Sequence, residues 1–186
     1  MQQKVLQLGN PILRRKSKFV RAEFIESVIV RDIIARLIGT MRRIKKISKD
    51  HGNGLSAPQI GFNYRIIVLY FDNRYNVLIN PKVVEKSKEI CEYGEGCLSF
   101  FYLRGLVRRN KKVKVVALNE KGERMRYTFL DRLASLALHE IDHLDGVLYL
   151  DKITDKRKIV SIDEKYKNQP GKLKTLRKII AYVTSG

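Results

Sequence analysis

Two histidines four positions apart, inside a segment with helical spacing, constrain this chain more than any other feature. Residues 139–143 read His-Glu-Ile-Asp-His, and on a helix the side chains of His139 and His143 project from one face. Both imidazoles can therefore bind one metal ion, and the carboxylate of Glu140 then lies where it can take a proton from a bound water. A catalytic metal usually needs a third protein ligand and one open position. The rest of the sequence has to supply that third ligand.

Three kinds of residue could be the third ligand. A third histidine would stand six residues after His143, but a tyrosine occupies that position. A downstream carboxylate would have to be Glu164, which lies in a basic and weakly periodic tail. Cys97 is the better candidate, because its small neighbours let the backbone approach another element and because a thiolate is a strong ligand. Cys91 reads as an ordinary thiol of the core or surface.

The bulk composition is that of a soluble globular protein. The chain has 186 residues, of which 44% are hydrophobic and 31% charged, and we expect a single domain over residues 1–186. No apolar run approaches the ~20 residues of a membrane span. The first residues lack the features of a secretory or transit signal, so we expect a cytoplasmic protein, with an organellar matrix as the alternative. Two cysteines are too few for a disulfide scaffold, and we expect no disulfide.

The charge balance is unusual. With 38 Lys and Arg against 19 Asp and Glu, the formal net charge is +19 and the pI is about 10.1. Such a charge favours a polyanionic partner such as RNA, a ribosome or an acidic membrane, although it can also merely solvate the surface. Residues 152–178 hold ten basic side chains against three acidic ones, a net of +7, so we expect this tail to contact the ribosome.

Hydrophobic periodicity predicts both helices and strands. Apolar residues at steps of three and four predict a helix from Phe24 to about Lys49, and a second one that starts at Asp131 as its N-cap and stops near Gly146. A short basic helix is predicted at 173–183. Alternating or β-branched runs predict strands at 65–70, 77–79, 83–90, around 94–101, at 112–118 and 124–129 (a hairpin) and at 147–150.

Three separated segments resemble the three signature motifs of peptide deformylases. They are GNGLSAPQIG at 52–61, EGCLS at 95–99 and HEIDH at 139–143, in family order and at family-like separations. The runs at 10–14 and 144–148 also fit, so the resemblance covers nearly residues 4–153 and leaves 153–186 as a basic C-terminal extension. It implies an α+β fold in which antiparallel sheets wrap around a central metal-binding helix, with an N-terminal helix and a basic C-terminal tail.

The resemblance also implies an activity, namely metal-dependent removal of the formyl group from N-formylmethionine at the start of nascent polypeptides, with release of formate. The implied metal is one divalent ion, commonly Fe²⁺ in this family, with Zn²⁺, Ni²⁺ or Co²⁺ as substitutes. Its ligands at the matching positions are Cys97, His139 and His143. Glu140 is implied as the general acid and base, and Gln59 and the backbone N–H of Leu98 as donors to the developing oxyanion. Gly54 and Arg104 are implied to contact the substrate or hold its cleft.

The sequence departs from the family pattern around the pocket for the substrate side chain. The matching positions are Arg132, Ser135 and Leu136, an unusual set for gripping a thioether. Leu138 stands where the family usually has glutamine, and Phe101 where it usually has proline. Two alternatives therefore stay open: a divergent amidohydrolase acting on another N-acylated substrate, and a basic ribosome- or RNA-binding relative with a vestigial site.

Overall fold

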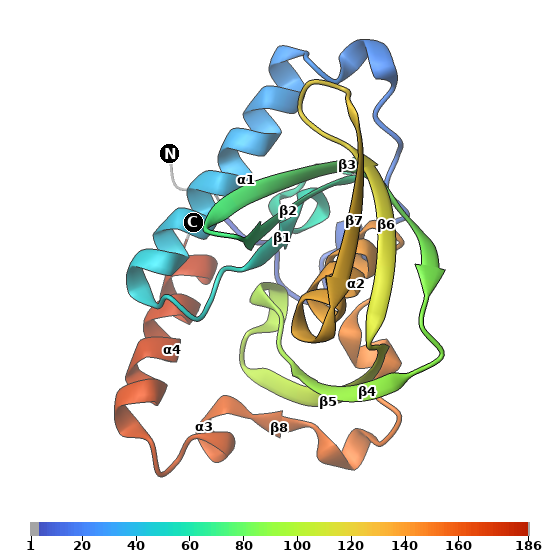
Figure 1. Cartoon of the computed structure of the whole chain (residues 1–186). Helices are drawn as coiled ribbons and strands as arrows, with labels where there is room; N and C mark the ends of the chain where they lie inside the picture. Colours follow the sequence, from blue (N-terminus) through green and yellow to red (C-terminus); the bar gives the residue numbers. More distant parts are fainter. Residues whose placement is uncertain (1–3, 186) are drawn as a thin grey trace.

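The computed structural model describes residues 4–185, which form two antiparallel sheets with helices around them (Figure 1). The five-stranded sheet has the order β1-β2-β3-β6-β7 and consists of β1 (Gly54–Ser56), β2 (Ile66–Phe71), β3 (Arg74–Lys86), β6 (Lys112–Leu118) and β7 (Arg124–Leu130). The three-stranded sheet has the order β4-β5-β8 and consists of β4 (Ile90–Glu95), β5 (Leu103–Asn110) and β8 (Val160–Ser161). All pairings between these strands are antiparallel, which confirms the α+β class with antiparallel sheets.

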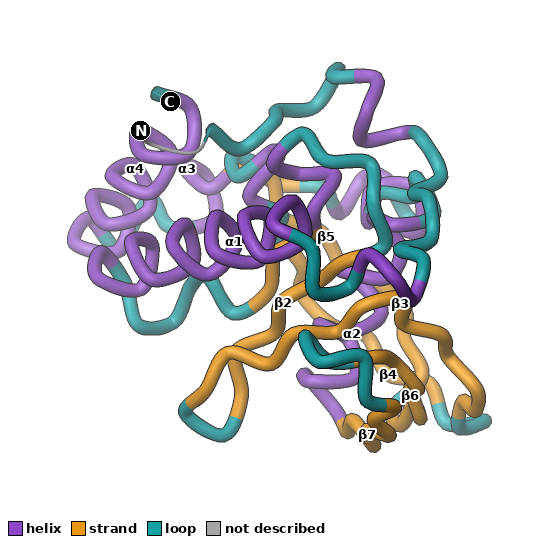
Figure 2. The backbone as a smooth tube through the Cα atoms, turned by 90° about the horizontal axis from the view of Figure 1, so that it is seen from above, coloured by secondary structure: helices purple, strands orange, loops and turns teal. Residues whose placement is uncertain are grey.

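The α-helices are α1 (Val28–Ile47), α2 (Asp131–Leu144), α3 (Ile162–Lys165) and α4 (Pro170–Thr184). Short 3₁₀ turns connect these elements at Pro11–Arg14, Ala22–Phe24, Ala57–Ile60, Leu98–Phe100, Tyr149–Lys152 and Lys156–Lys158. Helix α2 contacts strands of both sheets, while α1 and α4 run side by side (Figure 2). Within the described residues no helix is long and apolar enough to cross a bilayer, and both cysteines are free thiols.

Strand β2 is buried on both faces. Its residues Ile66 and Val68 belong to the core cluster that includes α1 and α4, whereas Ile67 and Leu69 belong to the cluster around α2. Successive side chains of a strand point to opposite faces, so each face of β2 is covered by helices. This accounts for its unbroken apolar run and fixes α2 against the sheet.

Helix α1 begins four residues later than predicted. Its N-cap is Ser27, whose hydroxyl accepts a hydrogen bond from the N–H of Val30 at 3.3 Å, and residues 22–24 form a separate 3₁₀ turn. Of the apolar residues expected at the start of the stripe, Val28 and Ile29 are exposed, whereas Ile25 is buried in the core but lies outside the helix. The stripe that does face the core has the predicted spacing of three and four, from Val30 to Ile44.

The strands predicted at 77–79 and 83–90 are largely one strand, β3, with β4 starting only at Ile90. At the expected break, Asn80 has φ 52° and its amide side chain bonds both the N–H and the C=O of Val20, at 2.9 and 2.8 Å. The pairing with β6 shifts its register between Ile79 and Lys82, and such a bulge tolerates a proline that cannot donate to the ladder. The turn signal at Asn80-Pro81 therefore marks a bulge.

Two predictions next to α2 are wrong. Asp131 is not the N-cap, because the sheet pairing continues to Leu130 and the chain turns into the helix at Asp131 itself, with φ 49°. Residues 147–150 do not form a strand. The carboxylate of Asp151 accepts a hydrogen bond from the N–H of Leu148 at 2.8 Å, and the chain closes into a 3₁₀ turn there. Strands β1, β5 and β8 were not predicted.

Candidate functional site

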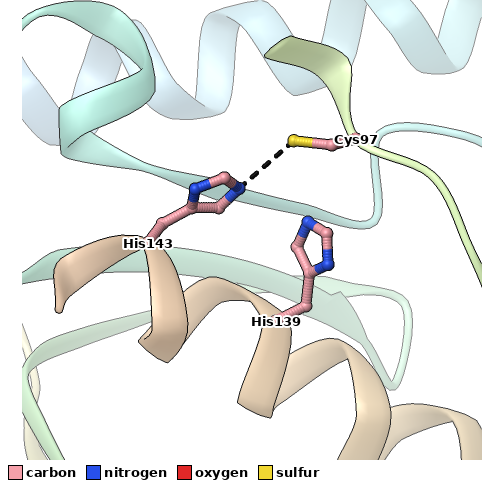
Figure 3. Close-up of side chains that lie close together, drawn as sticks. All are labelled: Cys97, His139 and His143. Carbon is pink, nitrogen blue, oxygen red and sulfur yellow. Dashed lines mark hydrogen bonds between the residues drawn. The ribbon is translucent and has the colours of Figure 1, made fainter. Parts of the chain in front are cut away.

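Cys97, His139 and His143 meet between the end of β4 and helix α2. Figure 3 shows both imidazoles rising from one helix toward a sulfur that comes from another segment. One donor atom from each residue lies within 4.8 Å of the other two, and all three side chains are buried. The sulfur of Cys97 is 3.2 Å from Nε2 of His143. One thiol and two imidazoles form a donor set that zinc or iron accepts, so these residues fit a metal ion.

His139 is oriented by a carboxylate on its far side. Its Nδ1 donates to Oε2 of Glu95 at 2.8 Å, which leaves Nε2 free to bind a metal. Glu95 also accepts from Arg109 at 2.8 and 3.0 Å and from the hydroxyl of Ser135 at 2.9 Å. Burial alone would raise the pKa of Glu95, but the hydrogen bonds from His139 and Arg109 lower this pKa to about 2. Glu95 is therefore a charged acceptor that fixes the imidazole ring.

Replacing Glu95 with glutamine is expected to destabilise the fold by about 3 kcal/mol and to weaken metal binding by about 10- to 100-fold. The amide cannot neutralise Arg109, which among the described residues then keeps Asp142 as its one carboxylate partner, 2.5 Å from its Nη1. Urea unfolding and metal titration measure the two effects. Glu92→Gln, an exposed change on the same strand, is the control and should alter neither. Parental stability together with parental metal affinity in the Glu95 variant would contradict this role.

Glu140 lies beside the metal-ligand group, with only 3% of its surface exposed. Its Oε2 is buried and has no hydrogen-bond partner among the described residues. Burial of the carboxylate raises the pKa of Glu140 to about 7, since removal from water disfavours the charged form. A carboxyl group with a pKa near neutrality can both accept and return a proton.

Gln59 is held with its NH₂ group toward the sulfur. Its Oε1 accepts from the backbone N–H and the hydroxyl of Ser56, at 3.0 and 2.9 Å. Its Nε2 then donates to Sγ of Cys97 at 3.3 Å and to Oγ of Ser99 at 3.2 Å. Leu98 is the first residue of the 3₁₀ turn that follows Cys97, a position where backbone N–H groups have no acceptor within the helix. Both groups are donors at the wall of the site.

These residues open into a cleft of about 720 Å³. Except for His143, every site residue predicted from the sequence lines it: Gly54, Gln59, Cys97, Leu98, Arg104, Arg132, Ser135, Leu136, His139 and Glu140. His143 lies among the buried residues behind them, only 1% exposed. The structure therefore brings together groups that are spread over more than eighty residues of sequence.

Two of the residues predicted to contact substrate, Ser135 and Arg104, are hydrogen-bonded to other residues of the protein. The hydroxyl of Ser135 donates to Glu95, and Arg104 is buried with its guanidinium bonded to the carbonyls of Phe101 and Leu103, at 2.6 and 2.7 Å. The guanidinium also lies 4.4 Å from the centroid of the Phe101 ring. Arg104 thus fastens the loop after Cys97. By contrast, Arg132 is exposed at the cleft, which leaves its charge available.

The other two candidates for the third metal ligand, a downstream carboxylate and a third histidine, do not fit this arrangement. Glu164 is exposed and pairs with Lys167 at 2.7 Å. The tyrosine at the third-histidine position, Tyr149, stacks on the ring of His139 with 5.8 Å between centroids. The third histidine of the chain, His51, bonds the hydroxyl of Ser48 through Nδ1 at 2.9 Å and is absent from the metal-ligand group.

Two features of the site were missed in the sequence. Glu95 lies inside one of the motifs. It could have been found by the rule that a metal-ligating imidazole usually donates to a carboxylate. Arg109, which pairs with Glu95, is not marked by any local sequence pattern. Lys165, Tyr166 and Lys172 also line the cleft. They lie in the C-terminal extension, where the sequence offered only a high charge.

Comparisons with known proteins agree with this geometry. The family model described as Polypeptide deformylase matches residues 2–159. Peptide deformylase 2 of Clostridium perfringens is 40% identical over 84% of this chain and 96% of that protein. The peptide deformylase of Pseudothermotoga lettingae is also 40% identical, over 85% of this chain and 86% of that protein.

Solved structures give the same result. The peptide deformylase from Synechococcus elongatus in complex with actinonin matches with a TM-score of 0.75 and 30% identity, covering 90% of this chain and 86% of that one. The Met-Ala-Ser-bound class I type b peptide deformylase from Acinetobacter baumannii matches with a TM-score of 0.74 and 29% identity, covering 82% of this chain and 99% of that one. By its sequence, its fold and the residues gathered in its cleft, this chain belongs to the polypeptide deformylase family.

Proposed function

We propose that this chain hydrolyses the formyl group from N-formylmethionine at the start of newly made polypeptides and releases formate. The observation that carries this proposal is the juxtaposition of a buried Cys97, His139 and His143 group with the carboxylate of Glu140 at one cleft. Membership of the deformylase family points to the same reaction. The alternatives, another N-acylated substrate or a vestigial site, gain no support from these comparisons.

We propose that Cys97, His139 and His143 hold one divalent ion, Fe²⁺ in the cell, with Zn²⁺, Ni²⁺ or Co²⁺ as substitutes. When bound, such an ion lowers the pKa of a coordinated water and polarises the formamide carbonyl. The protein's part is to present one sulfur and two imidazole nitrogens without rearrangement, and Glu95 keeps His139 in the required tautomer. Elemental analysis of anaerobically purified protein should find about one metal per chain.

The residues around this group would divide the remaining chemistry. Glu140 would accept a proton from the attacking water and pass it to the departing amine, which suits a carboxyl with a pKa of about 7. Gln59 and the N–H of Leu98 would donate to the oxygen on which negative charge develops. Because Ser56 fixes the amide of Gln59, this donor needs no reorganisation, and loss of one such donor typically costs on the order of 3 kcal/mol of barrier.

The peptide would bind as an extra strand. Strands β1 and β4 are edges of their sheets among the described residues, and both line the cleft through Gly54 and residues 93–95. Free backbone groups of an edge strand bind an extended peptide, and a solved relative carries Met-Ala-Ser. Gly54 would supply backbone contacts, and Leu136 and Arg132 would lie beside the substrate side chains. Ser135 and Arg104 would hold the walls.

The decisive assay is formate release from formyl-Met-Ala-Ser by iron-loaded protein. Turnover that depends on the metal and that a chelator abolishes is the expected result. Release of acetate from acetyl-Met-Ala-Ser at an equal or higher rate would instead favour the divergent amidohydrolase. Protein that contains metal and turns over neither peptide would overturn the proposal.

Replacing Gly54 with alanine is expected to lower kcat and to destabilise the fold by about 1–3 kcal/mol. A Cβ there would stand 2.6 Å from Oε1 of Glu140 and 2.9 Å from Cδ1 of Leu136, so the carboxylate would have to move. Kinetics on formyl-Met-Ala-Ser and thermal unfolding measure both effects. Gly39→Ala is the matched control. A Cβ on this helical glycine meets no described atom within 4 Å outside the backbone of its own helix, so the change should stabilise the fold by about 0.5–1 kcal/mol. Unchanged turnover in the Gly54 variant would contradict the close approach.

We also propose that the C-terminal extension belongs to the same single domain and contacts the ribosome. Helix α4 buries an apolar face that packs in the same core cluster as α1 and leaves Lys174, Arg177 and Lys178 exposed. A docked helix with a basic outer face is suited to ribosomal RNA. Neutralising Lys174 and Lys178 should reduce co-sedimentation with ribosomes at low salt. Because the proposed substrate is made where translation begins with formylmethionine, we propose that the protein acts in the cytoplasm or in an organellar matrix.

A further inference from the structure

The C-terminal extension forms part of the wall of the catalytic cleft. Lys165 is the last residue of α3, Tyr166 follows it, and Lys172 lies in the first turn of α4. All three line the cleft that also contains Cys97 and His139. The extension therefore reaches the space in which a substrate of the proposed reaction would lie, and it does so with two cations.

This wall of the cleft carries positive charge that the protein itself does not neutralise. Among the described residues, no carboxylate lies within 4.0 Å of the ammonium groups of Lys165 and Lys172 or of the guanidinium of Arg132, which lines the same cleft. Besides the buried Glu95 and Glu140, Asp50 is the one carboxylate among the lining residues. Three exposed cations against one exposed carboxylate favour a ligand with negative charge.

The position of Lys165 along β4 indicates which part of a peptide would meet this charge. Its Nζ lies 4.0 Å from the place of a Cβ on Gly94, three residues before Cys97 on the edge strand. Strand and extended peptide both advance about 3.3 Å per residue. A peptide paired along β4 with its formyl group beside Cys97 would bring its third residue next to Gly94. No side chain on Gly94 stands between that residue and the ammonium group.

Tyr166 limits where the two ammonium groups can lie. The Nζ atoms of Lys172 and Lys165 are 4.5 and 5.9 Å from the centroid of its ring. Cation–π contacts of this kind hold a lysine without using up its charge, so both side chains lose less freedom when a carboxylate binds. The basic wall is thus partly organised before a substrate arrives.

We propose that Lys165 and Lys172 make this enzyme prefer formylated peptides with an acidic side chain at the third or fourth residue. This inference rests on the proposed function. One or two partly exposed ion pairs correspond to a preference of about threefold to tenfold over the neutral amide counterpart. The preference should appear in kcat/KM through KM, because the contact lies away from the reacting atoms, and it should shrink as salt screens the charges.

The test compares C-terminally amidated peptides that differ in one group. Formyl-Met-Ala-Asp-Ser and formyl-Met-Ala-Ser-Asp are measured against the same peptides with asparagine, at low and at high salt. The parental chain should prefer the aspartate at one or both positions, and the double variant Lys165→Gln/Lys172→Gln should lose that preference. Lys156→Gln/Lys158→Gln removes the same charge from exposed residues of the extension that do not line the cleft, and it should keep the preference.

Measuring how the deformylated product peptides bind tests this inference separately from the proposed function. Calorimetry with Met-Ala-Asp-Ser and Met-Ala-Asn-Ser reports the same discrimination without any turnover, so an inactive protein still answers the question. Equal treatment of aspartate and asparagine at low salt would overturn the inference and leave the proposed function intact. An equal loss in the Lys156/Lys158 variant would also overturn it, since the effect would then come from net charge. Inhibition by an oligoribonucleotide without any peptide preference would identify the cleft as an RNA site instead.

Discussion

Replacing Glu140 with glutamine should lower kcat on formyl-Met-Ala-Ser by about a hundredfold to ten-thousandfold, the range that a positioned general acid and base contributes. Glutamine preserves the shape of the side chain but cannot take up the proton that the carboxylate would accept. Steady-state formate release measures the loss. Metal content should stay at the parental level, because the three ligands remain in place.

The same variant should be at least as stable as the parent. Oε2 of Glu140 is buried and has no hydrogen-bond partner among the residues that the structure describes. Burial of a carboxylate disfavours its charged form, so a neutral amide at this position removes an unfavourable charge. Thermal unfolding with and without metal checks this. Glu120→Gln, an exposed change in the β6–β7 turn, serves as the control for activity and stability. If the Glu140 variant kept more than a tenth of the parental kcat with full metal occupancy, Glu140 would not be the proton-transfer residue.

Replacing Cys97 with alanine should abolish metal binding at ordinary concentrations and activity with it. Losing a group that merely holds a ligand typically weakens metal binding 10- to 100-fold, and losing a ligand itself should exceed that range. The change also removes one of the two acceptors of the Gln59 amide and a buried contact of the small core cluster around Tyr149. Elemental analysis after dialysis, together with formate release, measures the outcome.

The other cysteine provides a matched control. Cys91 is half-buried on β4 and lies outside the metal-ligand group, so Cys91→Ala should keep both metal and activity. The contrast separates ligation from a general effect of removing a thiol. Full metal occupancy in the Cys97 variant would show that the ion does not need this sulfur, and the proposed site would then be wrong.

Local patterns in the sequence were sufficient for the elements whose signals are local. The paired histidines at a spacing of four required one helix face, the β6–β7 hairpin followed from alternation and its glycine turn, and the buried stripe of α1 followed from steps of three and four. The metal-binding chemistry of thiols and imidazoles also allowed Cys97, His139 and His143 to be selected as the candidate ligands. These inferences succeed because neighbouring residues determine where a side chain points.

The tertiary structure decided everything that depends on contacts between distant segments. Cys97 and His143 are 46 positions apart, and Glu95 and His139 are 44 apart, so no periodicity could report that they touch. The bulge at Asn80 and the turn at Leu148 arise from side-chain hydrogen bonds that override the strand pattern. The cleft wall formed by the C-terminal extension also depends on contacts between segments that are distant in the sequence. Sequence gives the charge of a lysine, but only the packing of helix α4 against α1 determines which surface that charge faces.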